Sequence, residues 1–328
     1  CHRRRSWFPP IFGCKSCALS NSWHLDFKHP DPRRRGEPDP LASSDFCFPK
    51  TTLSPRKDNR MNKAALVFLI IVSAFGPPAH AQSTDANDIA RQAEKTAFYQ
   101  GEDGRARVSM QIIDKQGRTR SRDITILRKD EINDNSESGD QRFFVYFRAP
   151  SDVRDTVFLV WKHPQADDDR WLYLPALDLV RRIAAGDERS SFVGSDFFYE
   201  DVSGRSAEED THVVQDTTET YYILKSTPKD PNRVEFAYYI SYIHKESFLP
   251  VQVEYYQSDH SKYREYTAEA VETIQGFPTV TRATMKDLAD GGRTTLTYSD
   301  IQYDIDLSDD IFTERYLRNP PRQFFGEN

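Results

Sequence analysis

Apolar and polar residues alternate along most of residues 105–303, and a period of two is typical of β-strands with one buried face. About eleven such strands are predicted, joined by short turns such as Lys115-Gln116-Gly117 and Gly291-Gly292. Turns this short connect antiparallel neighbours. The pattern therefore predicts an antiparallel sheet, either closed into a small barrel or strongly bent around a helix.

Two segments follow the helical period instead. In residues 85–100, Ile89, Ala93 and Ala97 fall on one stripe, and Gly101 follows the last turn. A shorter helix is predicted over 308–318. The polar runs 130–140 and 203–216 carry neither period strongly, so we expect a loop at the first and a loop with a helical piece at the second.

The stretch 171–202 is the densest in aromatic residues, which make up 12% of the chain. Several neighbouring strands are apolar on both faces, and such strands need a second apolar surface beyond the sheet core. That surface is either ordinary packing or a ligand cavity, and the pattern leaves both possible. The residues predicted to form a cavity wall and a cover over it are Phe144, Tyr146, Phe158, Val160, Trp171, Tyr173, Phe192, Phe197, Phe198 and Tyr199.

Gly194 and the preceding serines are expected to let the 191–202 segment hinge. Arg181 or Arg182 is expected to pair with a nearby acid such as Asp196 and hold that segment shut, or to bind an acyl head group. An exposed ion pair of little energetic weight is the alternative.

The N-terminal part differs in composition. Residues 1–60 are rich in Arg, Pro, Ser and His without periodicity, and are interpreted as non-native upstream translation that is disordered. Residues 61–81 combine a basic start, an apolar run and a small-x-small end, which predicts a signal peptide cleaved after Ala81 and export to the periplasm. Residues 82–328 are then one domain. All four cysteines precede Met61, so this domain has no disulfide and no thiolate.

Charge and motifs exclude several functions. Of the 44 basic and 51 acidic residues, 31 and 45 lie in 82–328, a net charge of −14, which disfavours nucleic acid as a partner. Four histidines remain there, none at metal-ligand spacing, and no GxSxG elbow is present. Asp167-Asp168-Asp169 is interpreted as a solvated acidic turn rather than a cation site. No catalytic residue, metal or cofactor is predicted.

A family resemblance rests on five segments: FRAP (147–150), VFL (157–159), WLYLPAL (171–177), RRI (181–183) and SFVGSDFFYED (191–201). With LPV (249–251), GFPT (276–279) and FTERYL (312–317), they resemble the outer-membrane lipoprotein-sorting protein family, related to the periplasmic carrier LolA. The resemblance implies an α+β fold, a strongly curved antiparallel sheet forming a half-open β-barrel closed by helices. It also implies a hydrophobic cavity for acyl chains and no catalysis.

Two functions follow as expectations. The first is a periplasmic, non-enzymatic carrier or chaperone for lipids or acylated proteins, which delivers its cargo to an RND-type membrane exporter or an outer-membrane acceptor. The second is a structural accessory subunit of such an exporter that binds no lipid. A barrel interior filled by Phe144, Tyr146, Phe158 and Trp171 favours the second.

Overall fold

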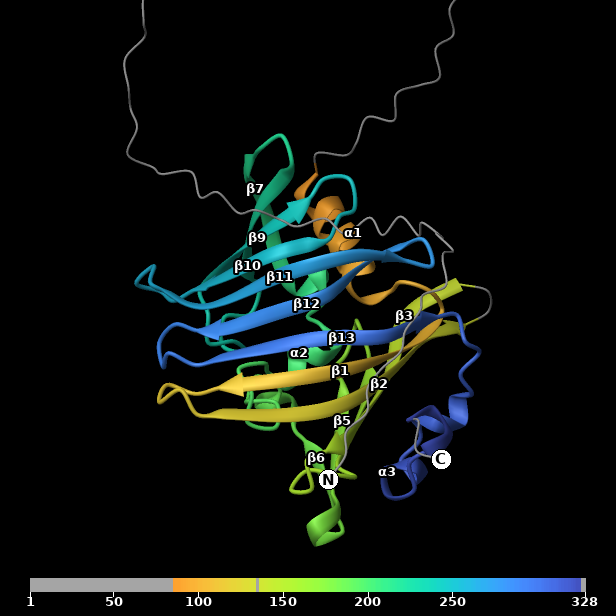
Figure 1. The fold of residues 1–328 in the computed structure, drawn as a ribbon. Helices are drawn as coiled ribbons and strands as arrows, with labels where there is room; N and C mark the ends of the chain where they lie inside the picture. The colour runs from red at the N-terminus through yellow and green to blue at the C-terminus, as the bar shows by residue number, and fades with distance from the viewer. Residues whose placement is uncertain (1–84, 134–135, 326–328) are drawn as a thin grey trace, which may run out of the picture. The chain divides into compact units, whose positions relative to one another are not determined.

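A computed structural model describes residues 85–133 and 136–325 of the chain (Figure 1). The segments interpreted as upstream translation (1–60) and signal peptide (61–81) lie outside these residues. Among the residues described, no helix is both long and apolar enough to cross a membrane.

One antiparallel sheet of thirteen strands dominates the described part of the chain (Figure 1). The first six strands are β1 (Asp103–Ile113), β2 (Thr119–Asn133), β3 (Ser136–Ala149), β4 (Val157–Lys162), β5 (Asp169–Leu174) and β6 (Leu179–Ile183). The other seven are β7 (Asp210–Thr217), β8 (Tyr221–Pro228), β9 (Tyr238–His244), β10 (Pro250–Tyr256), β11 (Lys262–Ile274), β12 (Phe277–Asp287) and β13 (Arg293–Tyr303).

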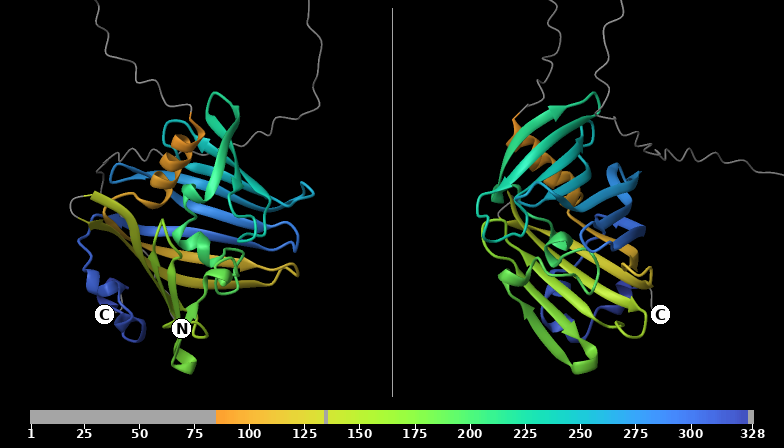
Figure 2. Two further views of the ribbon diagram at one scale, coloured as in Figure 1. Left: turned by 180° about the vertical axis from the view of Figure 1, so that it is seen from behind. Right: turned by 90° about the vertical axis from the view of Figure 1, so that its left-hand side faces the viewer.

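The strand order places the first and the last strand in sequence, β1 and β13, side by side in the sheet. The order is β6-β5-β4-β3-β2-β1-β13-β12-β11-β10-β9-β8-β7. Every neighbouring pair is therefore a hairpin in sequence except β1 with β13, which pair from Gly104↔Tyr303 to Ile113↔Arg293. The two edge strands, β6 and β7, are consecutive in sequence, and the sheet curls without pairing them (Figure 2).

The sheet has thirteen strands rather than about eleven. It is curled and unclosed, which corresponds to the strongly bent alternative and not to a closed barrel. Strand β7 lies almost entirely in the polar run 203–216 and was not predicted. As an edge strand it leaves Val213 59% exposed, so it lacks the continuous apolar face by which a strand is recognised. Backbone pairing also extends β2 and β3 into the run expected to be a loop, with Asp130 opposite Gln141.

Helix α1 (Ala86–Phe98) covers the concave face at the β7–β9 end of the sheet (Figure 2). Its first turn is capped by Asp85, whose carboxylate accepts a hydrogen bond of 2.8 Å from the Asn87 N–H. The predicted stripe is confirmed for Ile89 and Ala93, which are buried against Leu224 and Ile243. Ala97 is exposed.

The chain between the two edge strands, residues 184–209, is here named the connecting segment. It contains η2 (Ala185–Asp187), α2 (Tyr199–Ser203) and η3 (Ala207–Glu209), and it crosses the concave side of the sheet (Figure 2). The chain after β13 is named the C-terminal segment (304–325). It contains η4 (Asp309–Phe312), α3 (Arg315–Arg318) and η5 (Arg322–Phe324).

Strands β3 to β5 are covered on both faces. Phe143, Val145 and Phe147 belong to the core on the concave side, which includes residues of the connecting segment. Their neighbours Phe144 and Tyr146 point to the convex side, where the C-terminal segment buries them. The second apolar surface that the sequence demands is therefore supplied by the C-terminal segment at this end of the sheet.

Candidate functional site: a cavity on the concave face

A cavity of about 440 Å³ lies between the concave face of the sheet, α1 and the connecting segment. Its volume falls within the range of about 300–1,000 Å³ that is usual for small-molecule sites. Most of its wall is apolar. The aliphatic and methionine wall residues include Ala93, Ala106, Val108, Met110, Ile124, Ile126, Val145, Val202, Leu224, Ile243, Leu249, Val253, Met285 and Leu296.

Both halves of the sheet build this wall. Val108 and Met110 of β1 point inward because side chains alternate along a strand. Across the central pairing, Leu296 of β13 lies opposite Met110 and continues the same surface. Further round the curl, Val253 of β10 and Ile243 of β9 complete it. The cavity thus depends on the joining of β1 to β13.

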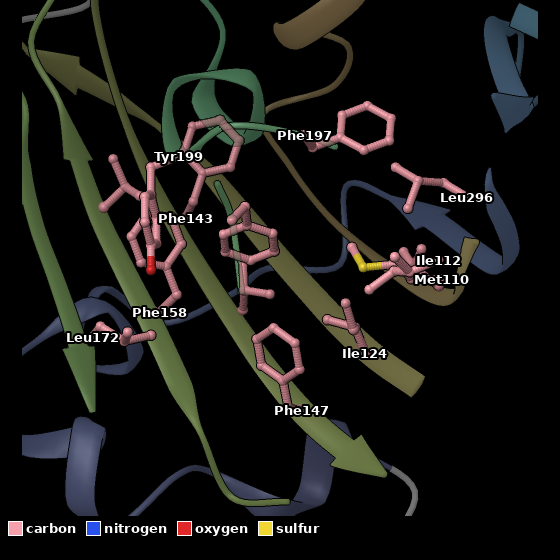
Figure 3. Packing of buried hydrophobic residues seen from close by; sticks show 14 of the residues in the cluster. Met110, Ile112, Ile124, Phe143, Phe147, Phe158, Leu172, Phe197, Tyr199 and Leu296 are labelled. Atoms are coloured by element: carbon pink, nitrogen blue, oxygen red, sulfur yellow. The ribbon is translucent and has the colours of Figure 1, made fainter. Parts of the chain in front are cut away.

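Two of the predicted cavity residues, Phe192 and Phe197, line the cavity from the connecting segment. Their backbones pair with each other, since the Phe192 N–H donates to the Phe197 carbonyl at 2.7 Å. Figure 3 shows Phe197 facing Leu296, whereas Tyr199 turns toward Phe143 and Phe158. The connecting segment therefore closes part of the cavity with aromatic side chains.

Phe158, Val160 and Tyr199 are on the concave side but lie in solid packing beside the cavity. The ring centre of Phe158 is 5.4 Å from that of Phe192 and 5.1 Å from that of Tyr199. Such tilted contacts are favourable for aromatic rings. These three residues fill the β3–β5 end of the concave face.

The assignment of Phe144, Tyr146, Trp171 and Tyr173 to the cavity is corrected. All four point to the convex face of β3 and β5 and pack in the cluster with the C-terminal segment. Tyr146, for instance, stacks on Phe325 with ring centres 4.2 Å apart. Because the run in β3 is apolar without interruption, the sequence does not indicate which residues face the concave side. The sequence prediction therefore assigned residues of both faces to the cavity.

Phe198 also lies away from the cavity wall. The guanidinium carbon of Arg264 lies 3.9 Å from the centre of its ring and that of Arg189 lies 5.1 Å away, both within cation–π range. Phe198 therefore helps to attach the connecting segment to the β11 region.

Buried ion pairs hold the connecting segment, but they are not those predicted. Arg264 of β11 pairs with Asp201 and donates to the Asp196 carbonyl at 2.9 Å. Arg170 of β5 donates to Glu188 at 2.8 Å, and only 2% of its side chain is exposed. These contacts attach the segment to strands from both halves of the sheet.

Arginines of the segment itself add to this attachment. Arg189 pairs with Glu200 and donates to Glu235 at 2.7 Å, and Arg205 donates to Asp210 at 3.0 Å. The Arg189 contacts keep the pKa of the Glu235 carboxyl below its usual value, although burial acts to raise it.

The predicted pairing of Arg181 or Arg182 with Asp196 is wrong, and the alternative of an exposed ion pair describes both arginines; binding of an acyl head group stays a prediction. Arg181 lies 3.5 Å from Asp187 and Arg182 pairs with Asp169, and both arginines are more than half exposed. Asp196 instead accepts a 2.6 Å hydrogen bond from the Thr294 hydroxyl of β13, while burial raises the pKa of its carboxyl. Arg181 and Arg182 were predicted to pair with Asp196 because they are close to it in sequence, but they lie on the edge strand β6, where they are exposed to solvent.

Gly194 lies in a hydrogen-bonded turn of the connecting segment. Its φ of +75° is in the left-handed region that favours glycine. Arg120 of β2 donates to the Gly194 carbonyl at 3.1 Å, and Ser195 N–H donates to the Phe192 carbonyl at 3.0 Å. The hinge at Gly194 stays a prediction.

The acidic turn is ion-paired, and of its three carboxylates only Asp167 is mainly in solvent, with 58% of its side chain exposed. Asp168 accepts from Arg170 at 2.7 Å, Asp167 accepts from Arg233 at 2.7 Å, and Asp169 pairs with Arg182. Within the ranges that the structure describes, no group of three or more histidine, cysteine, aspartate or glutamate residues could hold a metal ion.

The sequence prediction missed the polar residues of the cavity. Tyr239, Tyr255, Tyr266 and Tyr298 line it from β9, β10, β11 and β13. The sequence does carry a signal at Arg264, because it alternates with Tyr266 and Ala268 on one face of a strand. An arginine on an apolar face indicates a buried ion pair.

Comparisons with known proteins agree with this architecture. A family model described as "-like: Uncharacterized protein" matches residues 139–319, more than half of the 328-residue chain. No curated protein matches the chain. A solved DUF1329 family protein from Desulfovibrio piger is 27% identical with a TM-score of 0.65, and the match covers 71% of this chain and 97% of that one.

Two further solved structures are similar. A putative outer membrane lipoprotein-sorting protein domain from Vibrio parahaemolyticus is 24% identical, with a TM-score of 0.63 over 71% of this chain and 98% of its own. A LolA superfamily protein from Nitrosomonas europaea is 20% identical, with a TM-score of 0.56 over 71% of this chain and all of its own. The chain therefore belongs to the family that the matching model describes, and its fold is LolA-like.

Proposed function

We propose that this protein is a periplasmic, non-enzymatic carrier or chaperone, which holds acyl chains of lipids or acylated proteins during outer-membrane sorting or export. The observation that carries the proposal is the apolar cavity of about 440 Å³ on the concave face. Its LolA-like fold supports the same function, because one solved relative is described as a putative outer membrane lipoprotein-sorting protein domain.

The physical basis is the transfer of hydrocarbon from water to the cavity. Each buried CH₂ contributes about 0.8 kcal/mol, so an acyl chain can be retained firmly without a covalent bond. Delivery then requires a receiver that binds the same chain more strongly, such as an RND-type exporter or an outer-membrane acceptor. The carrier itself needs only a way to open.

The connecting segment is the element suited to open. It closes part of the cavity through Phe192 and Phe197, yet among the described residues no β-ladder joins it to the main sheet. Its attachments are side-chain contacts, which include the ion pairs of Arg264, Arg170 and Arg189, hydrogen bonds such as that of Thr294 to Asp196, and ring packing against Phe158. Movement of the segment therefore leaves all thirteen strands paired.

Lipid extraction from the native envelope tests the proposal. Protein purified from it is expected to carry acyl lipids that mass spectrometry detects. Ala106→Phe fills the cavity from β1 and is expected to reduce the bound lipid at least about tenfold, a loss of about 1.4 kcal/mol in binding. Ser109→Phe on the exposed face of the same strand is the matched control and is expected to retain lipid. Wild-type protein that repeatedly carries no lipid would contradict the proposal.

A second candidate is a structural accessory subunit of an RND-type exporter that binds no lipid. The packing of Phe158, Phe192 and Tyr199 favours it, because these rings fill one end of the concave face. Leu177, just before β6, and Leu179, its first residue, are 70% and 46% exposed and offer an apolar contact for a partner. This function is favoured if an exporter co-purifies with the lipid-free wild-type protein and is lost from the lipid-free Leu177→Asp variant.

A further inference from the structure

Three tyrosines of the cavity wall have hydroxyls without a partner. Tyr255, Tyr266 and Tyr298 project from β10, β11 and β13 into the wall. Within residues 85–133 and 136–325, none of the three hydroxyls makes a hydrogen bond, and none is sealed inside the protein as a buried orphan atom. The hydroxyls therefore border the cavity space.

Two neighbouring polar side chains of this wall, in contrast, are hydrogen-bonded. Tyr239 donates to Asp210 at 2.8 Å, and His212 hydrogen-bonds to Ser226 at 2.7 Å and to the Ala207 carbonyl at 2.9 Å. Tyr255 lies directly opposite Tyr239 in the β9–β10 pairing, so a paired and an unpaired hydroxyl are neighbours in one row. Buried polar groups are normally hydrogen-bonded, and an unpaired group in a cavity indicates a missing partner.

The three hydroxyls can act only as protonated groups near neutral pH. Burial raises the pKa of Tyr255 and of Tyr298 to about 12, and it raises the pKa of Tyr266 as well. Each hydroxyl therefore keeps its proton and can donate it to an acceptor. The guanidinium carbon of Arg264 lies 5.2 Å from the ring centre of Tyr255, and its charge is paired with that of Asp201.

The surrounding wall determines what carries the acceptor. Val253, Met285 and Leu296 are aliphatic or thioether neighbours of the tyrosines in the same cavity. A small polar ion would leave this apolar surface in contact with water, whereas an alkane would leave three donors unpaired. An amphiphile with one oxygen-bearing end satisfies both parts of the wall.

We propose that Tyr255, Tyr266 and Tyr298 donate hydrogen bonds to the acyl oxygens of the cargo, the carboxylate of a free fatty acid or the ester carbonyl of a lipid, while its hydrocarbon occupies the apolar part of the cavity. This inference rests on the proposed carrier function and makes it more specific. It assigns the cavity to the oxygen-bearing end of an acyl compound and not to its hydrocarbon alone.

Competition binding tests the inference on the isolated protein. A neutral fluorescent probe, N-phenyl-1-naphthylamine, is bound in the cavity and displaced by lauric acid, methyl laurate or dodecane. The test variant is the triple substitution of Tyr255→Phe, Tyr266→Phe and Tyr298→Phe, which removes only the hydroxyls. The matched control is Tyr238→Phe on the other face of β9, whose hydroxyl contacts the exposed His260.

The triple variant is expected to bind lauric acid at least about tenfold more weakly than wild type, with dodecane unchanged and Tyr238→Phe equal to wild type. Weaker binding of methyl laurate as well identifies the carbonyl as the acceptor, and weaker binding of lauric acid alone identifies the carboxylate. Equal affinity of wild type and triple variant for both oxygenated ligands overturns the inference but leaves the carrier function intact. Failure of all three ligands to displace the probe from the wild type overturns the carrier function itself. Thermal unfolding confirms that the variant is folded.

Discussion

The two ends of the concave face use similar residues for different purposes. At the β3–β5 end, the rings of Phe147 and Phe158 both contact that of Phe192, and the C-terminal segment covers the opposite face of the strands. From β1 and β2 across β13 to β8, the wall is also rich in apolar residues but encloses free space. Hydrophobic composition alone therefore does not distinguish a packed core from a cavity. The distinction depends on which segments cover each face of the sheet.

Truncation at the filled end is expected to have the largest effect on stability. Phe144→Ala removes a fully buried ring that lies 6.2 Å from Phe325 in a stacked arrangement. Such a deletion typically costs about 3–5 kcal/mol because the surroundings collapse only partly. Denaturant unfolding measures the loss, and ligand affinity of the folded fraction is expected to match wild type. A binding defect as large as the stability loss would mean that the two faces are coupled.

An equivalent truncation at the open end is expected to cost less. Leu296 is 8% exposed and already borders the cavity, so Leu296→Ala enlarges existing space rather than creating a new void. The expected loss is about 2 kcal/mol, at the low end for a leucine-to-alanine change. The same unfolding experiment measures it. A loss equal to that of Phe144→Ala would show that the open end is packed as tightly as the filled one.

The smallest expected effect is a pH-dependent change in Tm caused by the ion pair between Arg189 of the connecting segment and Glu235. Because the folded-state pKa of Glu235 is below its usual value, its pairing with Arg189 stabilises the fold above pH values near 4.5 and loses this effect as pH falls through the lowered pKa. Glu235→Gln is therefore expected to lower Tm at pH 7 and to approach wild type at a pH below the lowered pKa of Glu235. Melting curves at the two pH values measure this difference. A constant difference in Tm across the range would assign the effect to packing instead.

Much of the fold could be predicted from local pattern. The helix over 85–100 and the hairpins of β1 with β2 and of β11 with β12 follow from period and turn residues. The edge strand β7 was missed because five of its eight residues are exposed to solvent, so that neither face looks apolar. The pairing of β1 with β13 joins residues about two hundred positions apart, and no local pattern encodes it.

The candidate site was less accessible to sequence reasoning. Phe192 and Phe197 were placed in the right segment, but Phe144 and Trp171 were assigned to the wrong face. In β3 every residue from Phe143 to Phe147 is apolar, so alternation carries no information on direction. Tyr255, Tyr266 and Tyr298 are ordinary strand residues by pattern, and only the cavity shows that their hydroxyls lack partners.

The central pairing of β1 with β13 has a consequence for how the molecule forms. All other sheet contacts are between consecutive strands, so the meanders β1–β6 and β7–β13 can each assemble from local hairpins at a small cost in loop entropy. Joining them closes a loop of nearly two hundred residues and is the natural late step in folding. Val108 and Leu296 face a common space only after that step. A folding intermediate that contains both meanders would therefore have its hydrogen-bonded strands but no ability to bind ligand.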